Sequence, residues 1–371
     1  MLPALKLPFR TTEPLAVTMW DFSWLERRWP GAGYEDWALA LDELQERGYD
    51  AVRIDAYAHL VAAAPEKTWE LLPEWSVQDW GAPARTRVRV MPALLEFIAA
   101  CGSRGIKVGL SCWFRQDVEN TRLSIGSGLR HGEIWVKTLD LIQRAGLLQH
   151  IVWVDLCNEW PIKVWAPFFQ TRPEPPEDPW DSPRCVAWMR DAMSVIRAAH
   201  PSLPLTFSLW PGKIWKPGDL DFFDFLEPHI WMALERNYYK EVGYNYERFD
   251  PKGYENVVLN AERVYRERPD YWQAGLIESI DFYADISRRS GLALVTTECW
   301  GIVDYKDWPL LDWGWVKDLC ALGTEKAAEH RRWAAIATSN FCGPQFNGMW
   351  RDVAWHQRLT RIIKSSVLDP T

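Results

Sequence analysis

The sequence predicts an α/β fold in which eight parallel strands and their helices close into a (β/α)8 TIM barrel. Short apolar runs bounded by turn residues recur eight times along the chain, and helix-period segments that stop at glycine or proline lie between most of them. This alternation is typical of a parallel sheet covered by helices. Because single barrels span roughly 200 to more than 400 residues, the chain of 371 residues is expected to form one domain over residues 1–371.

The strands are expected where the apolar runs lie, at residues 15–21, 51–55, 106–112, 150–156, 205–210, 225–231, 292–297 and 334–340. Helices are expected at residues 37–47, 94–104, 134–144, 185–199 and 271–290, with a last helix at 353–365. A glycine or a proline follows each of the first five helices and would end it. Between strands five and six only residues 216–223 remain, which predicts a single helical turn.

Three connections are long, and they follow strands two, four and six at residues 56–88, 160–184 and 232–255. All three leave the carboxyl ends of strands, the face on which barrel enzymes build their sites. The middle connection is rich in proline but also carries Trp165 and Trp180. A polar linker would lack such residues, so an ordered, irregular lid is expected.

Composition and charge argue against several classes of protein. The formal net charge is −8 and basic residues form no run beyond scattered Arg-Arg pairs, so no nucleic-acid partner is expected. The sequence contains no uncharged apolar stretch of about 18 residues, so no membrane span is expected. The first residues, MLPALKLPFRTTEP, lack the features of a signal peptide, which predicts a cytoplasmic protein. The seven cysteines are expected to be buried, reduced thiols.

Tryptophan is the compositional outlier, with 25 residues against 12 tyrosines and 14 phenylalanines. A flat indole face stacks well on the apolar face of a pyranose ring, and ligand pockets are commonly lined by aromatic side chains. Trp37, Trp188 and Trp333 lie in helix-like patterns and are expected to serve packing instead. The tryptophans that follow predicted strands are expected to cluster at the site: Trp24, Trp113, Trp160, Trp300 and Trp350.

Two predicted strands end in a glutamate at the point where each should give way to a loop. The run HIVWVDLCNEWP ends in Asn158 and Glu159, and the run GLALVTTECWG ends in Glu298. The sequence between the two glutamates leaves room for about three βα units of roughly 30 to 45 residues each. Paired carboxylates across a bond between sugars are the working groups of glycosidases.

These strand ends resemble those of clan A of the glycoside hydrolases, the (β/α)8 enzymes that include cellulases, mannanases and β-galactosidases. The resemblance implies that Glu159 is the general acid/base and that Asn158 contacts the sugar 2-hydroxyl. It implies that Glu298 is the nucleophile and that Arg53, in AVRIDAY, supports it. Independently of the resemblance, the reaction requires that the nucleophilic carboxylate be ionised, which a neighbouring cation favours. It also requires that the general acid be protonated, which an apolar setting favours.

The sequence departs from the cellulase-like branch at strand six. That branch usually carries His-x-Tyr there, where this chain has His229, Ile230 and Trp231. His229 takes the histidine's place, whereas the tyrosine's hydrogen bond to the nucleophile is left to Tyr238 or Tyr239. The other residues expected to bind substrate are Trp231, Trp113, Trp300, Asp21 and, as an aromatic platform after strand eight, Trp350.

Several of these residues also fit purely structural roles. Arg53 would also fit a buried ion pair of the core, and His229 a buried hydrogen-bonded histidine. Asp21 and Asp55 either bind sugar hydroxyls or cap loops. The seven histidines show no metal-binding spacing and no glycine-rich phosphate loop follows a strand, so no metal and no cofactor are expected.

The function expected is that of a retaining β-glycoside hydrolase acting on oligosaccharides or small glycosides through Glu159 and Glu298. Exo-action is favoured, because long aromatic loops would wall off one end of the cleft. Two alternatives remain open: a cellulase-like barrel that binds sugar without cleaving it, and a transglycosylase that passes the covalent intermediate to a sugar acceptor. Turnover of any β-glycoside would distinguish a hydrolase from the non-catalytic sugar-binding barrel. Analysis of the products would distinguish hydrolysis from transfer to a sugar acceptor.

Overall fold

The computed structural model describes residues 3–9, 11, 13–75, 77–172, 178–209, 220–245, 249–309 and 311–370. Its centre is a curled parallel sheet of seven strands in the order β11-β13-β1-β2-β5-β6-β7. These strands are β1 (Leu15–Asp21), β2 (Ala51–Asp55), β5 (Lys107–Ser111), β6 (Ile151–Asp155), β7 (Leu205–Thr206), β11 (Leu294–Thr296) and β13 (Trp333–Ala337). Short parallel pairings join the two ends of this sheet into the predicted barrel.

The closing pairings lie at strands five, six and seven of the barrel. The fifth strand continues from β7 into β8 (Ser208–Leu209), which pairs with β9 (Glu227–Pro228). The sixth strand continues into β10 (Ile230–Trp231), which pairs with β12 (Cys299–Trp300). An isolated bridge between Leu226 and Leu294 links the sixth strand to β11. The eight-strand order expected from the sequence is therefore confirmed, although strands five and six are each divided into two short pieces.

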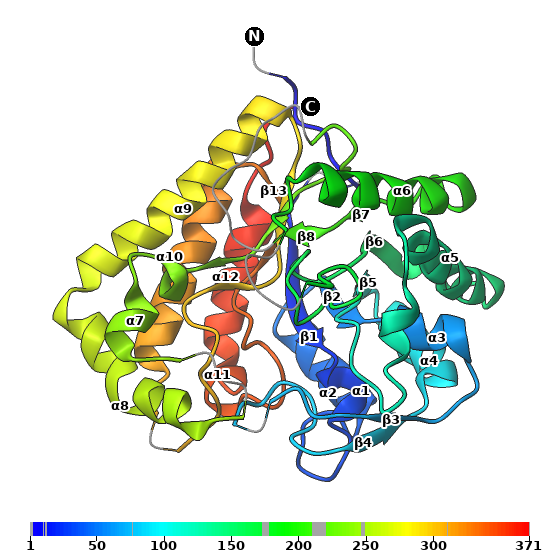
Figure 1. The fold of residues 1–371 in the computed structure, drawn as a ribbon. Coiled ribbons are helices and arrows are strands. Elements are labelled where there is room, and N and C mark those ends of the chain that lie inside the picture. The colour runs from blue at the N-terminus through cyan, green and yellow to red at the C-terminus, as the bar shows by residue number, and fades with distance from the viewer. Residues whose placement is uncertain are drawn as a thin grey trace.

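Helices cover the outside of the barrel. They are α1 (Ser23–Glu26), α2 (Trp37–Glu46), α3 (Ala58–Ala63), α4 (Val90–Gly102), α5 (Gly128–Arg144), α6 (Pro183–Ala199), α7 (Tyr238–Val242), α8 (Pro251–Glu267), α9 (Pro269–Ser290), α10 (Gly314–His330), α11 (Asn347–Trp350) and α12 (Val353–Ser365). Figure 1 shows α9, α10 and α12 side by side on one side of the strands, and α5 and α6 packed together on the other. Among the described residues, no helix combines the length and apolar character that a membrane crossing requires.

The helix ends follow the expected local chemistry. Asp36 accepts hydrogen bonds from the backbone N–H groups of Ala38 and Leu39 at the start of α2, and Ser182 caps α6 directly before Pro183. Gly291 ends α9 in the left-handed conformation at a φ of 77°. The expected helices are present, with ends shifted by up to six residues. Two longer helices, α8 and α10, were not expected from the sequence.

The three long connections differ in their content. The one after β2 contains α3 and an antiparallel hairpin of β3 (Trp69–Leu71) and β4 (Thr86–Val88). The described part of the one after β6 has no helix or strand before α6. The one after β10 contains a 3₁₀ turn (Met232–Leu234) and α7, and it leads into α8. Of the helical turn expected at residues 216–223, the first four residues lie outside the described part of the chain.

The barrel interior is filled at its base by large apolar side chains and carries charge near its upper end. Gly109 on β5 makes room for Trp153 on the neighbouring β6, since a Cβ at position 109 would overlap the indole ring. Closer to the carboxyl ends, Arg53 on β2 is fully buried inside the barrel. All seven cysteines are buried free thiols, as expected. The barrel interior is therefore apolar at its base and contains a buried polar network at the carboxyl ends of the strands.

Candidate active site

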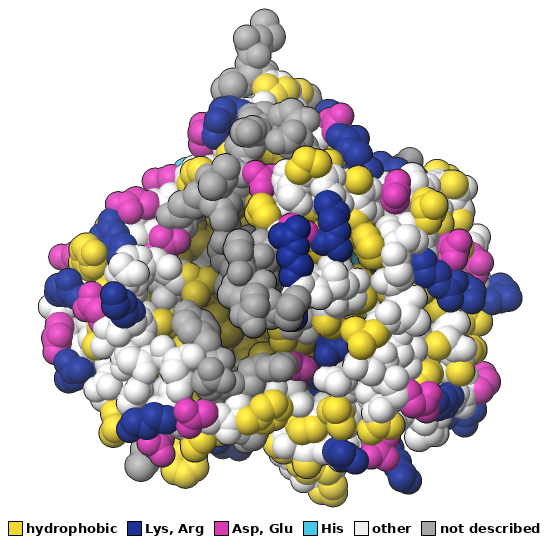
Figure 2. Space-filling view, viewed as in Figure 1, with side chains coloured by type: hydrophobic (Ala, Val, Ile, Leu, Met, Phe, Trp, Pro, Cys, Tyr) yellow, Lys and Arg dark blue, Asp and Glu magenta, His cyan; other side chains and the backbone are white. Residues whose placement is uncertain are grey.

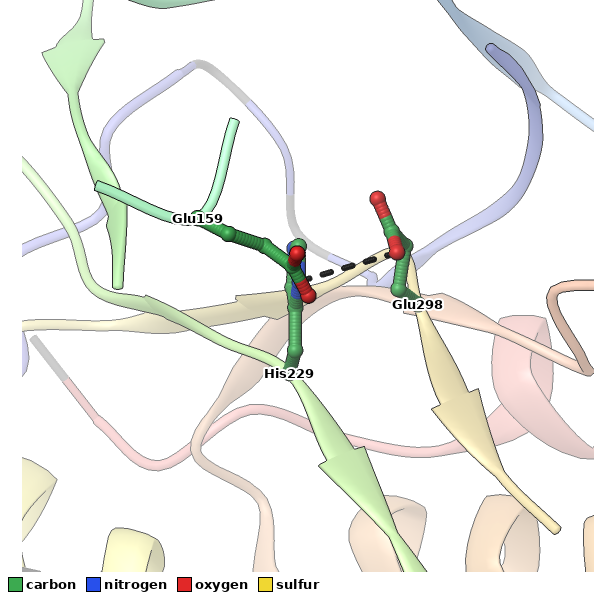
Figure 3. A group of neighbouring side chains, drawn as sticks. All are labelled: Glu159, His229 and Glu298. Carbon is green, nitrogen blue, oxygen red and sulfur yellow. Dashed lines mark hydrogen bonds and ion pairs between the residues drawn. The ribbon is translucent and has the colours of Figure 1, made fainter. Parts of the chain in front are cut away.

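Two glutamates face each other at the carboxyl end of the barrel, with a histidine between them (Figure 3). Glu159 follows β6 with a positive φ of 47°, and Glu298 lies between β11 and β12. The Nδ1 atom of His229 lies 3.1 Å from Glu159 Oε1 and 3.7 Å from Glu298 Oε2. One ligand atom from each of the three residues lies within 4.8 Å of the others. A left-handed conformation in a non-glycine residue is costly, and such residues concentrate at functional sites.

Arg53 ties the second glutamate to the base of the site. Its Nη1 donates to Glu298 Oε1 over 2.9 Å, and its Nη2 donates to Asp155 Oδ2 over 2.6 Å. Nη2 also donates to Asn158 Oδ1 over 2.7 Å, so the same guanidinium positions the residue next to Glu159. Its Nε lies 3.4 Å from Glu227 Oε1. One rigid, fully buried fork therefore orients groups from strands four, six and seven.

The buried charges do not balance unless some carboxyls hold a proton. Three carboxylates, those of Asp155, Glu227 and Glu298, surround the single Arg53 guanidinium. Burial raises the pKa of Glu227, against the lowering effect of Arg53, which favours a proton on this carboxyl. Burial also lowers the pKa of His229 to about 4, which leaves a neutral imidazole between the glutamates.

The two facing glutamates differ in their surroundings. Burial raises the pKa of Glu159 to about 7, although Trp165 lowers it by donating from Nε1 to Glu159 Oε2 over 3.1 Å. Burial also raises the pKa of Glu298, and Glu159 adds to this, while His229 and Arg53 oppose it. Only Glu298 accepts a hydrogen bond from the arginine. The environments therefore favour a proton on Glu159 and a charge on Glu298, the division that acid and nucleophile require.

A cavity of about 530 Å³ opens above the glutamates. Figure 2 shows this face of the molecule hollowed near its centre, with hydrophobic side chains visible inside the hollow. The tryptophans that line the cavity are Trp75, Trp80, Trp113, Trp165 and Trp231. Asp21, Asn158, Glu159 and Glu298 line it as well. The structure thus brings six of the ten site residues expected from the sequence to the cavity wall, and Arg53 and His229 directly beneath it.

Trp300 and Trp350, which were expected to bind substrate, do not line the cavity. Trp300 is fully buried, donates from Nε1 to the carbonyl of Ala337 over 2.8 Å, and packs on Gly323 of α10. Trp350 donates from Nε1 to Glu43 Oε2 over 2.6 Å and lies beneath the guanidinium of Arg47. Both indoles point away from the cavity into the contact between barrel and helices. The strand-eight side of the cavity is lined instead by Asn340.

Two further tryptophans of the expected cluster also serve packing. Trp24 is fully buried against Trp37 and Phe97, and Trp160 is fully buried against Phe169 and Trp188. Neither lines the cavity. Of the five tryptophans expected to cluster with the glutamates, only Trp113 lines the cavity. Trp231 of β10, which was also expected to bind substrate, lines it too, whereas Trp75, Trp80 and Trp165 come from loops.

Tyr238, Tyr239 and Asp55 all form hydrogen bonds that fix the loops around the site. The Tyr238 hydroxyl donates to the carbonyl of Ala261, and the Tyr239 hydroxyl is hydrogen-bonded to Asp304 and accepts from the Val303 N–H. Glu298 is held by Arg53 and lies beside His229 instead. Asp55 accepts from the backbone N–H groups of Tyr57 and Trp113, so it fixes a loop.

Sequence reasoning missed several polar residues of the cavity wall, namely Gln78, Tyr244, Asp304 and Asn340. Three of them lie on loops and meet in one hydrogen-bonded group: Asp304 Oδ1 accepts from Gln78 Nε2 over 2.6 Å and from the Tyr244 hydroxyl over 2.7 Å. Asn340 follows the last residue of β13 by only three positions. The signal that the sequence offered for Asn340 was its position as the last residue of the strand expected at residues 334–340.

The same centre offers a geometry for a cation. Glu159, His229 and Glu298 each present one ligand atom within 4.8 Å of the others, and both carboxylate oxygens and imidazole nitrogens bind divalent metals. The Nδ1 atom of His229 already lies within hydrogen-bonding distance of Glu159.

Comparison with known proteins places this geometry in context. Residues 17–364 match a family model described as sugar-binding cellulase-like. A candidate glycoside hydrolase from Parabacteroides distasonis is 52% identical, with 97% of this chain and 96% of that chain covered and a TM-score of 0.93. No curated protein matches the chain.

More distant structures share the fold alone. A glycoside hydrolase of family 5, subfamily 18, from Streptomyces cattleya, solved in complex with GlcNAc, is 10% identical over 97% of this chain and 83% of that chain, with a TM-score of 0.54. A family 5 mannosidase from Rhizomucor miehei is 10% identical over 96% of this chain and 94% of that chain, with a TM-score of 0.53.

Proposed function

Because the chain belongs to the sugar-binding cellulase-like family, with the fold of clan A glycoside hydrolases, we propose that it hydrolyses β-glycosidic bonds with retention of configuration. Glu298 is the nucleophile and Glu159 the general acid/base. The substrates are oligosaccharides or small glycosides. The P. distasonis protein, described as a candidate glycoside hydrolase, supports this class of reaction.

The observation that carries the proposal is the short distance between the two glutamates. One oxygen of Glu159 and one of Glu298 lie within 4.8 Å of each other. In retaining glycosidases the two carboxyl groups are only about 5–5.5 Å apart, whereas inverting enzymes hold them roughly 6.5–9.5 Å apart to admit a water molecule. The observed spacing between the carboxylate oxygens is closer to the separation in retaining enzymes and supports direct attack by a carboxylate.

The proposed reaction has two steps. Glu298 attacks the anomeric carbon and forms a glycosyl ester while the bond to the leaving oxygen breaks and Glu159 gives that oxygen its proton. Glu159, now ionised, then takes a proton from water as the water attacks the anomeric carbon, and the ester bond to Glu298 breaks. Arg53 and Asn158 hold the centre in place, and the neutral His229 lies close to both carboxyls.

The test is turnover of 4-nitrophenyl β-glycosides of gluco, galacto, manno, xylo and fuco configuration, with proton NMR of the first sugar released. Retention predicts the β-anomer first and the α-anomer only after mutarotation. Glu298→Gln is the matched control, since it keeps the shape but removes the nucleophile. An α-anomer as first product would show inversion. Binding without turnover of any glycoside would favour the non-catalytic sugar-binding barrel.

A further inference from the structure

Four side chains form a polar wall along one side of the cavity: Asp21, Gln78, Trp80 and Asn340. None of them is needed for the two-glutamate chemistry. Each is at most 5% exposed, and each carries one buried polar atom without a hydrogen-bond partner among the described residues. These atoms are Asp21 Oδ2, Gln78 Oε1, Trp80 Nε1 and Asn340 Oδ1. Four such groups in one wall are unusual, because buried polar groups are nearly always paired.

The chemistry of these atoms is fixed by their neighbours. Gln78 donates from Nε2 to Asp304 Oδ1, so its Oε1 is left as an acceptor. Asp21 accepts the Ser23 N–H at Oδ1 over 2.7 Å, and because burial raises the pKa of this carboxyl, its Oδ2 donates a hydrogen bond when protonated and accepts one when ionised. Trp80 offers only an N–H donor. A group of hydroxyls on one ring, each able to donate and accept, matches this mixture, whereas an apolar aglycone would leave all four atoms unpaired.

The wall lies away from the acid/base side of the cavity. The residues next to Glu159 are Ile162, Val164 and Trp165 of the loop after β6, and Trp165 is hydrogen-bonded to Glu159. Since a general acid protonates the leaving oxygen, the leaving group belongs on that side. Asp21 ends β1 and Asn340 follows β13, so these two belong to the opposite half of the barrel. The wall therefore faces the sugar that is transferred to Glu298.

Hydrogen bonds join three connections of the barrel on this side of the cavity. Gln78, in the loop after β2, bonds Asp304 in the loop after β12. In the same two loops, the Asp307 N–H donates to Asp79 Oδ2 over 3.1 Å. Asp307 Oδ1 in turn accepts from the Gly348 N–H over 2.9 Å, which adds the loop after β13.

The indole of Trp80 adds an aromatic contact between these loops. It packs on Phe341 and Phe346 of the loop after β13, with ring centroids 5.7 and 4.7 Å away. Its Nε1 is nevertheless left without a partner among the described residues. Hydrogen bonds and packed aromatic rings therefore hold these three loops together along this side of the cavity.

We propose that the polar wall is a closed subsite for a single terminal pyranose, so that the enzyme removes one sugar at a time from the non-reducing end, with Asp21, Gln78, Trp80 and Asn340 reading its hydroxyls. This rests on the proposed glycoside hydrolase function. It names the residues that determine specificity and the class of substrate, a β-linked glycoside with an unsubstituted terminal hexose or pentose.

The first experiment uses reducing-end-labelled β-linked oligosaccharides of three to six units, built from the sugar of the best 4-nitrophenyl glycoside. The expected first product is one unit shorter than the substrate at every length. First products from internal cleavage would overturn the closed subsite while leaving the hydrolase function intact. Failure to turn over any aryl glycoside or oligosaccharide would instead refute the hydrolase function, so the two failures are distinguishable.

The second experiment tests the wall by Asn340→Ala on the best aryl glycoside and on its monodeoxy analogues. We expect a loss of roughly 10- to 100-fold in kcat/KM on the parent substrate, the effect of one buried hydrogen bond to a sugar hydroxyl. On the one analogue that lacks the matching hydroxyl, variant and wild type should differ by less than about threefold. An equal loss on every analogue would indicate a merely structural role and overturn the assignment, as would no loss at all.

Asn120→Gly is the matched control. Asn120 also carries a buried amide oxygen without a described partner, but it does not line the cavity. Its φ of 56° is one that glycine adopts freely, so the substitution removes the amide without straining the backbone. This variant should keep wild-type kcat/KM on every analogue. A pattern like that of Asn340→Ala would show that the loss does not depend on contact with the sugar.

Discussion

Replacing Arg53 by Met should destabilise the protein, because it removes the one cation from a buried group of acids. The guanidinium is fully buried and contacts Asp155, Glu227 and Glu298. Removing one partner of a buried ion pair typically costs about 3–5 kcal/mol, since the remaining charge stays buried without compensation. Unfolding entropies near 2.1 cal/mol/K per residue over 371 residues convert this to a drop in Tm of roughly 4–6 °C.

The loss should depend on pH, and its sign follows from the acids. Arg53 lowers the pKa of Glu227 and of Glu298, so both pKa values rise further above their ordinary value near 4.5 when the arginine is removed. An acid whose folded pKa is raised stabilises the fold below its unfolded pKa, and this contribution is lost as pH rises towards the folded pKa. The variant should therefore lose more stability at pH 8 than at pH 5.5.

The assay is thermal unfolding of wild type, Arg53→Met and Arg53→Lys at both pH values. Arg53→Lys keeps the charge but loses the fork, so it should fall between the other two. A Tm for Arg53→Met within 1 °C of wild type at pH 8 would contradict the charge argument. A larger loss at pH 5.5 than at pH 8 would contradict it as well.

Three further predictions concern protonation and metal. The pKa of about 7 at Glu159 predicts that kcat/KM falls as pH rises through about 7, and an alkaline limb unchanged in Glu159→Gln would remove this residue as its source. Trp165→Phe removes a hydrogen bond that lowers the pKa of Glu159, so the limb should move to higher pH, and a shift to lower pH would refute that cause. If the two glutamates act directly, prolonged dialysis against EDTA should leave kcat unchanged. Loss of activity that one divalent metal restores would instead show that Glu159, His229 and Glu298 bind a metal that the reaction needs.

The framework of the fold was predictable because barrel strands buried on both sides are almost uninterrupted apolar runs. Those runs end where side chains turn towards the site, so Asn158, Glu159 and Glu298 could be picked out by position alone. Arg53 was indicated by the resemblance to clan A, in which an arginine on strand two supports the nucleophile. The single-domain boundary at residues 1–371 and the cytoplasmic location stay predictions.

The features that were missed depend on tertiary contacts. α10 contains two glycines and buries most of its length, which hides the one-sided apolar pattern of a surface helix. The roles of Trp300 and Trp350 could not be read from sequence, because an indole packs as well behind a strand as it stacks on a sugar. Gln78 lines the cavity in a loop that is hydrogen-bonded to Asp304, more than 200 positions away in the sequence.

The most direct test of the two-glutamate mechanism is pre-steady-state release of a good phenolate leaving group from an aryl β-glycoside by Glu159→Gln and Glu298→Gln. Without its acid, Glu159→Gln should still form the glycosyl ester on Glu298 and then stall, giving a burst of phenolate. Without the nucleophile, Glu298→Gln should give neither burst nor turnover. A burst from Glu298→Gln and none from Glu159→Gln would reverse the two roles, and full activity in either variant would remove that residue from the mechanism.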